Sequence, residues 1–261
     1  MRVKALLLQQ WYGLSDPALE EALGDRLWFR AFVGLSLDEG APDHSVSRFR
    51  KGLRERGLDG ALFAEIERQL SAKGLLVRTG TLLDATLVEA AVRKPGSPAG
   101  ARSAADPEAD WTRKGGKGAF GYKAHLAVDE TSGLIRRAGL TSAKVAESEA
   151  ADDLVCGDEG ALYADRAYEH KERRRRLKAA GIKDRIMHRG HKYQPALPPW
   201  QAVRNRLIAP VRAAVKRVFG TLKRTYGYRR VRYRGLAANL LQLRFLCIAF
   251  NLRRADALLT P

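Results

Sequence analysis

The chain has 261 residues, 45% of them apolar, which is enough to fold one large domain or two modest ones around a core. Its 47 lysines and arginines outnumber its 29 aspartates and glutamates, which gives a formal net charge of +18. This charge is larger than solubility requires. It indicates a polyanionic partner, most commonly nucleic acid. The two cysteines are too few for a disulfide framework. The five scattered histidines lack the ligand spacing of a zinc site.

Membrane association is not predicted. The apolar run near the start is too short for a secretory signal peptide, and Gln242, Arg244 and Asn251 interrupt the apolar segment near the end. We therefore expect a cytoplasmic protein without a membrane partner.

Residues 1–75 are expected to form a small helical domain. Asp16 is a good helix start, Asp25 can cap a second helix, and a third begins near Asp59. Before the third helix, residues 42–51 combine a turn, a hydroxyl cap and a basic helix start. That segment either contacts a phosphate of a nucleic acid or is an ordinary solvated helix start.

Residues 76–261 are expected to form an α/β domain, because short apolar runs with β-branched residues replace the helical pattern near Gly80. Strands are predicted at residues 77–84, 122–128, 134–140, 161–165 and 182–187, with a hairpin turn at 129–133. Helices are predicted at residues 144–154, 169–180, 204–226 and 236–253, and Pro210 should begin or kink the third of them. A long mobile loop is predicted at residues 93–121 and a connector at 193–200.

The strongest local signal for nucleic acid lies at residues 228–234. Aromatic rings and guanidinium groups are interleaved there, so the segment can bind phosphates and stack on bases. The four consecutive arginines at residues 173–176 are either a solvated helix face or a second phosphate contact.

Two aspartates, Asp84 and Asp165, lie in apolar, strand-like segments. A buried carboxylate needs a positive partner, and a divalent metal ion is the expected one, although each aspartate could instead cap a following helix. Acids on the first and fourth strands, with a late helix to follow, match the order of elements in an RNase H-like polynucleotidyl transferase. In such enzymes carboxylates hold two magnesium ions for phosphoryl transfer.

Taken together, these motifs resemble a DDE transposase of the bacterial insertion-sequence-five family over nearly the whole chain. The resemblance rests on a series of short motifs in a fixed order: residues 14–16, 29–30 and 42–45, then 84–86, 121–125 and 163–168, and finally 181–187, 217–224 and 228–236.

The resemblance implies an RNase H-like catalytic domain at residues 76–261, with a mixed sheet flanked by helices. An all-helical domain at residues 1–75 should precede it and serve DNA-end binding or oligomerisation. The family cleaves and joins DNA with Mg²⁺, or with Mn²⁺ in its place, and Asp84 and Asp165 match its first two catalytic, metal-binding acids. The implied partners are double-stranded DNA at the terminal inverted repeats and at the target, and further copies of the chain, in the nucleoid of a bacterial cytoplasm.

The third acid of the family falls on Lys216, and no glutamate follows Glu172. An ammonium group there would oppose the binding of a divalent ion, so we expect impaired cleavage. Residues implied in DNA binding are basic and come from both domains: Arg48, Arg50, Lys123, Arg217, Lys223, Arg224, Arg229, Arg230, Arg232 and Arg234.

Two other functions stay open on the sequence alone. One is a transposase-derived DNA-binding protein without catalysis, such as a regulator or an inhibitor of transposition. The other is a basic RNA-binding protein, which would prefer single-stranded or structured RNA to duplex ends.

Overall fold

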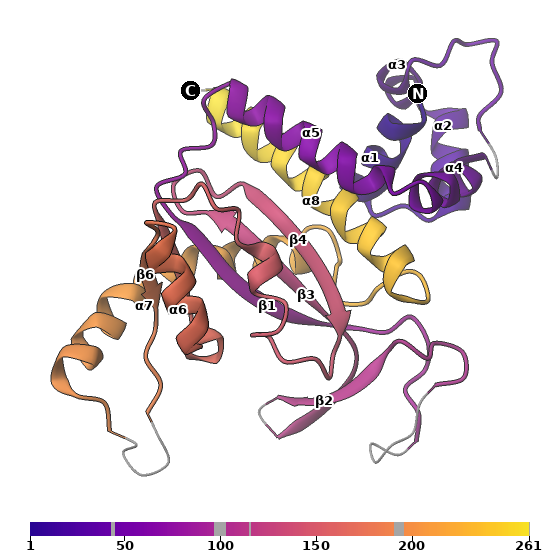
Figure 1. The fold of residues 1–261 in the computed structure, drawn as a ribbon. Helices are drawn as coiled ribbons and strands as arrows, with labels where there is room; N and C mark the ends of the chain where they lie inside the picture. Colours follow the sequence, from indigo (N-terminus) through magenta and orange to yellow (C-terminus); the bar gives the residue numbers. More distant parts are fainter. Residues whose placement is uncertain (43–44, 97–102, 115, 191–195, 261) are drawn as a thin grey trace.

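A six-stranded mixed sheet forms the centre of the fold (Figure 1). The computed structural model describes residues 1–42, 45–96, 103–114, 116–190 and 196–260. The strands are β1 (Thr81–Glu89), β2 (Asp110–Lys114), β3 (Lys117–Asp129), β4 (Ile135–Ser142), β5 (Ala161–Ala164) and β6 (Lys183–Ile186).

Strand directions define the topology. Five strands lie in the order β4-β3-β1-β5-β6, and of these only β3 runs antiparallel to its neighbours. The sixth strand, β2, pairs with the first residues of β3. This is the strand order of an RNase H-like fold, which confirms the predicted fold class. The hairpin predicted at residues 129–133 joins β3 to β4.

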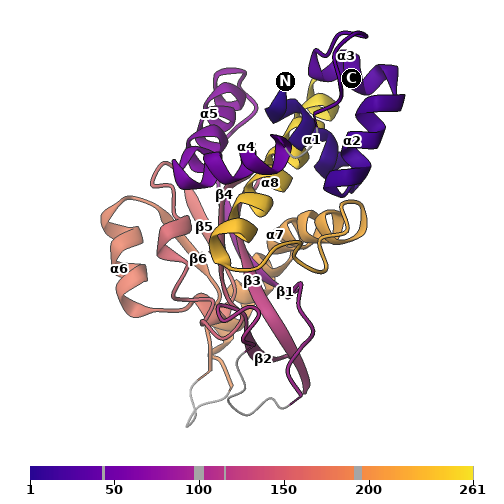
Figure 2. The ribbon, with the colours of Figure 1, turned by 90° about the vertical axis from the view of Figure 1, so that its right-hand side faces the viewer.

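Helices cover both faces of the sheet (Figure 2). The helices α7 (Pro199–Arg224) and α8 (Leu236–Leu259) pack on one face, where their apolar side chains share a core with those of β1 and β3. The helix α6 (Lys171–Ala179) and the short 3₁₀ turn η1 (Asp152–Leu154) pack on the other face, around a second core. Pro210 lies inside α7, which begins eleven residues earlier at Pro199.

The predicted helical N-terminal region is confirmed. It consists of α1 (Arg2–Tyr12), α2 (Asp16–Asp25), α3 (Leu27–Val33), α4 (Ser45–Glu55) and α5 (Leu58–Ala72). The helices α1 and α5 lie against α8 (Figure 1), where Trp11 donates a hydrogen bond to the Ala249 carbonyl over 2.9 Å and Arg244 pairs with Asp59 at 2.6 Å. The division into two domains at residue 75 stays a prediction.

The helix predicted at residues 144–154 is wrong, since the structure has turns there and only the three residues of η1 are helical. Tertiary hydrogen bonds take the carbonyl groups that a helix would use: Lys123 donates to Val145 and Arg173 donates to Ser148. The hydrogen bonds from Lys123 and Arg173 therefore outweigh the helix propensity of residues 144–154.

The loop predicted at residues 93–121 is partly wrong. Residues 110–114 form β2 and residues 117–121 extend β3, where the rings of Trp111 and Phe120 pack at 5.5 Å. The segment is also anchored at Asp106, which is buried and accepts a hydrogen bond of 2.6 Å from the Tyr122 hydroxyl. Residues 97–102 and 115 of the predicted loop, 191–195 at the predicted connector and 43–44 in the predicted phosphate-contact segment lie outside the described residues.

None of the helices in the described part of the chain is long and apolar enough to cross a lipid bilayer. Of the longest two, α7 is rich in basic residues, and α8 carries buried polar side chains such as Gln242 and Asn251 that hydrogen bond within the protein.

His125 gives the fold a testable pH dependence. Burial, together with the charge of Lys123, lowers its pKa to about 4, below the 6.5 of a free histidine. Between these values the unfolded chain binds the proton more tightly, so stability falls as the pH falls. We expect about 2 kcal/mol less unfolding free energy at pH 5 than at pH 7 from this group.

Urea unfolding of His125→Gln at both pH values measures this contribution. The variant should lose that part of the pH dependence, and the exposed His170→Gln control should keep it. Equal pH dependence in the wild type and in His125→Gln would show that His125 does not titrate as described.

Candidate active site

The structure brings Asp84 and Asp165 together at the carboxyl ends of two parallel strands. β1 and β5 pair with Thr81 opposite Leu162 and Leu82 opposite Tyr163. Continuing this register places Asp84 beside Asp165, at the point where β5 has ended and β1 continues, paired with β3 only. Neighbouring strands lie about 4.8 Å apart, so the two carboxylates share one small region.

The alternative that each aspartate only caps a helix holds in part for one of them. Asp165 does cap the short turn η2 (Arg166–Tyr168), since one of its carboxylate oxygens accepts the Ala167 N–H over 2.8 Å. Its other oxygen is directed at Arg212. Asp84 lies within β1, which continues to Glu89, and caps no helix.

Arg212 is the side-chain cation that the two aspartates share. It projects from α7 and is 7% exposed, and its Nη2 atom lies 3.6 Å from Asp84 Oδ1 and 3.8 Å from Asp165 Oδ2. Both distances are longer than a hydrogen bond. Its Nη1 atom meets the sulfur of Met187 at 3.6 Å, and its buried Nε atom has no hydrogen-bond partner among the described residues.

Lys216, at the predicted third position, lies one helical turn beyond Arg212 and is exposed. The buried stripe of α7 contains Arg212 and Val215 but not Lys216. Sequence reasoning missed Arg212, although its place one turn before Lys216 on a helix predicted to pack on the sheet was an available signal.

Tyr168 lies beside the aspartates, three residues after Asp165. Its side chain is fully buried, and its hydroxyl has no hydrogen-bond partner in the described part of the chain. Burial raises the pKa of this hydroxyl, and the negative charges of Glu147, Asp84 and Asp165 raise it further. The charges that act on the buried Tyr168 hydroxyl are therefore mostly negative.

These residues fit one divalent cation. Two carboxylates already converge on Nη2 of one guanidinium, whose buried Nε has no hydrogen-bond partner among the described residues, and carboxylate oxygens are the ligands that Mg²⁺ and Mn²⁺ prefer. An ion held by both aspartates would replace a poorly bonded guanidinium as their counter-ion. A second ion would lack a carboxylate at Lys216.

A second cluster, of Cys156, Asp158 and Glu159, is unsuited to a metal ion. Asp158 pairs with Arg136 at 2.6 Å and with Arg78 at 3.0 Å, and Glu159 accepts backbone N–H groups. Burial raises the pKa of the Cys156 thiol to about 11, so the thiolate that a metal would need is disfavoured.

The residues predicted to bind DNA fall into two groups. Some are engaged within the protein: Arg50 pairs with Asp16, Lys123 and Lys223 donate to the Val145 and Leu87 carbonyls, and Arg232 donates to that of Leu14. The others are exposed, namely Arg48, Arg217, Arg224, Arg229, Arg230 and Arg234, although Arg230 also pairs with Glu89 at 3.1 Å.

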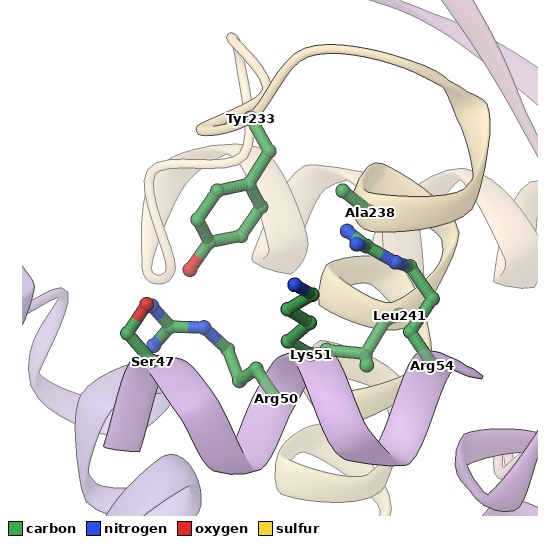
Figure 3. Close-up of a pocket in the computed structure, with 7 residues that line it drawn as sticks. All are labelled: Ser47, Arg50, Lys51, Arg54, Tyr233, Ala238 and Leu241. Carbon is green, nitrogen blue, oxygen red and sulfur yellow. The ribbon is translucent and has the colours of Figure 1, made fainter. Parts of the chain in front are cut away.

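A basic pocket of about 230 Å³ lies between α4 and the start of α8 (Figure 3). Arg50, Lys51 and Arg54 project into it from α4, and Tyr233 closes it from the segment before α8, with its hydroxyl directed toward Ser47. The Arg50 guanidinium stacks 5.2 Å from the centre of the Tyr233 ring. The pocket thus joins the N-terminal helices to the predicted aromatic and basic segment.

Two family models match the chain. Residues 76–252 match the family described as "Transposase DDE domain", and residues 1–52 match "Transposase domain (DUF772)". The chain therefore belongs to the DDE transposases. Within them it is of the insertion-sequence-five type, as the motifs predicted.

Among solved structures, the chain is 13% identical to one titled "Crystal structure of the Mos1 Strand Transfer Complex", with a TM-score of 0.24 and 96% of this chain and 78% of that chain covered. It is 11% identical to "Crystal structure of a pre-cleavage Mos1 transpososome", with a TM-score of 0.23 and 96% of each chain covered. Similarities this low do not by themselves define a fold.

Arg212→Met tests the role of Arg212 as the counter-ion. Methionine has a similar length but no charge, so Asp84 and Asp165 would lose the positive charge that they share. With divalent ions removed by EDTA, we expect the unfolding free energy to fall by about 2–4 kcal/mol. The matched control Arg217→Met, at an exposed site on the same helix, should change it by less than about 0.5 kcal/mol. Equal stability of the two variants would contradict this role.

Proposed function

We propose that this chain is an insertion-sequence transposase that binds the terminal inverted repeats of its element and performs Mg²⁺-dependent cleavage and transfer of DNA strands. The observation that carries the proposal is the convergence of Asp84 and Asp165 on one cationic nitrogen at the ends of β1 and β5. Membership of the DDE transposases supports the same chemistry.

The two aspartates are the proposed metal ligands. A Mg²⁺ or Mn²⁺ ion there would supply Lewis-acid activation of the attacking water or 3′-hydroxyl, and a second ion would be needed to stabilise the leaving oxygen. Asp84 is held by the pairing of β1 with β3, and Asp165 is held by the N–H of Ala167. Arg212 balances their charge before an ion binds, and its positive charge is well placed to face a phosphate of the DNA.

The proposed DNA surface includes the segment 224–234 and α4. Arg224, Arg229 and Arg234 are exposed on the first, and Lys51 and Arg54 line the basic pocket beside it. Aromatic rings accompany the charges at Tyr233. Residues 1–75 would take part in binding DNA ends and in forming a dimer or higher oligomer, in the nucleoid of a bacterial cytoplasm.

Lys216 should impair catalysis in this chain. Its ammonium group lies one helical turn from Arg212 and adds positive charge where the family has an acid, so it would weaken cation binding. We expect Lys216→Glu to cleave labelled element-end DNA in Mg²⁺ or Mn²⁺ at least about 100-fold faster than the wild type, a figure on the scale of a lost electrostatic contribution to catalysis.

The double variant Lys216→Glu/Asp84→Asn is the control for that assay and should be inactive. If the wild type cuts as fast as Lys216→Glu, the third position is assigned wrongly. If neither cuts while both bind DNA, the chain is instead a transposase-derived DNA-binding protein without catalysis.

The proposed DNA surface predicts a defined salt dependence. Replacing Arg229 and Arg234 together with alanine should remove two phosphate contacts, and the slope of log Kd against log salt should fall by about 2. Fluorescence anisotropy of a labelled duplex measures this slope. The control pair Arg68→Ala and Lys73→Ala, exposed but outside the surface, should leave the slope unchanged. Equal slopes for all variants would place the DNA elsewhere.

A further inference from the structure

The basic pocket between α4 and the start of α8 has cations along one of its walls. Arg50, Lys51 and Arg54 project into it from α4, because residues three and four apart lie on the same face of a helix (Figure 3). The other described lining residues are a serine, a tyrosine, an alanine and a leucine. The described lining of the pocket therefore carries positive charge and no carboxylate.

Acidic groups outside the pocket balance only part of this charge. Asp16 pairs with Arg50, and Glu55 reaches Lys51 at 3.8 Å. Both side chains of the second pair are exposed, and such pairs are weak. Arg54 has no ion-pair partner among the described residues. The charge of Arg54 and most of the charge of Lys51 are therefore available to a ligand.

The opposite wall of the pocket is fixed before any ligand binds. Asn239 is fully buried and holds the backbone of Tyr233, since it accepts the Tyr233 N–H over 3.0 Å and donates to the Tyr233 carbonyl over 2.9 Å. The Arg50 guanidinium stacks on the Tyr233 ring and also donates to Asp16 over 2.7 Å. A preformed pocket costs a ligand little ordering of side chains.

The polar groups that line the pocket suit a phosphate. Arginine and lysine donate charge-assisted hydrogen bonds to phosphate oxygens, and the Ser47 and Tyr233 hydroxyls are further donors. The chain has a net charge of +18 and belongs to the DDE transposases, so the DNA backbone is the source of phosphate that these observations favour.

We propose that this pocket binds one internal phosphate of the DNA backbone, held between α4 and the segment before α8. The exposed arginines at residues 224–234 lie along a surface, whereas the pocket contacts its phosphate from two distant parts of the chain. Phosphate contacts fix the register and orientation of a protein on a duplex, so this one sets both parts of the chain on the DNA. The inference rests on the proposed function, because it assigns one phosphate of the same ligand to a defined site.

The test is a scan of an element-end duplex in which one phosphate at a time is replaced by a neutral methylphosphonate. Binding is measured by fluorescence anisotropy. At one position the wild type should lose affinity at least about tenfold, on the scale of a lost charge-assisted hydrogen bond. The variant Lys51→Met/Arg54→Met should bind the unmodified duplex more weakly, and at that position it should lose at most about twofold more, because its pocket no longer holds the phosphate.

The control Arg56→Met/Lys73→Met removes two positive charges that are exposed and do not line the pocket. It should keep the full loss at the position that the pocket contacts. Arg50 is left unchanged because its pair with Asp16 supports the fold. Thermal unfolding without DNA establishes that both variants are folded, as expected for substitutions at exposed positions.

The outcomes separate this inference from the proposed function. If the wild type binds the duplex and the pocket variant loses affinity at the same positions and by the same factors, the phosphate lies elsewhere, and the inference fails while the proposed function stands. If the wild type does not bind the element-end duplex, the proposed function fails and the inference fails with it. A loss at one position that only the pocket variant lacks supports the inference.

Discussion

The active-site region depends on the parallel pairing of β1 with β5 and on the point where that pairing stops. Because β5 ends at Ala164, the next residue, Asp165, leaves the sheet directly beside Asp84, and the two carboxylates meet at the carboxyl end of β5. Their mutual repulsion has to be balanced, and Arg212 on α7 provides the charge. The packing of α7 on the sheet and the geometry of the acids are therefore coupled.

Arginine has two distinct uses in this basic chain. Arg30, Arg50, Arg136, Arg173 and Arg212 are buried, and they hold loops and carboxylates in place through carbonyl and carboxylate partners. The planar guanidinium group with five donors suits this purpose better than an ammonium group does. The exposed arginines of the segment 224–234 and of α4 are those that remain for DNA. Net charge alone therefore overstates the DNA-binding surface.

Much of the fold could be predicted from the sequence, because strands and amphipathic helices have local periodicities. Asp84 and Asp165 were found because charged residues in apolar strands are unusual. Arg212 was missed because its role arises from contacts between segments far apart in the chain. The same cause explains the wrong helix at residues 144–154, where Lys123 and Arg173 bind the backbone carbonyls. The strand β2 was missed because its pairing with β3 depends on a cross-strand aromatic contact within a glycine-rich segment.

The shared cation position between Asp84 and Asp165 is most directly tested by anomalous diffraction from crystals soaked in Mn²⁺. We predict one peak within coordination distance of both aspartates, about 2.0–2.6 Å, with the Arg212 guanidinium displaced from its present place. A peak only at Cys156, Asp158 and Glu159, or no peak at the ends of β1 and β5, would contradict a metal-dependent active site at these two carboxylates.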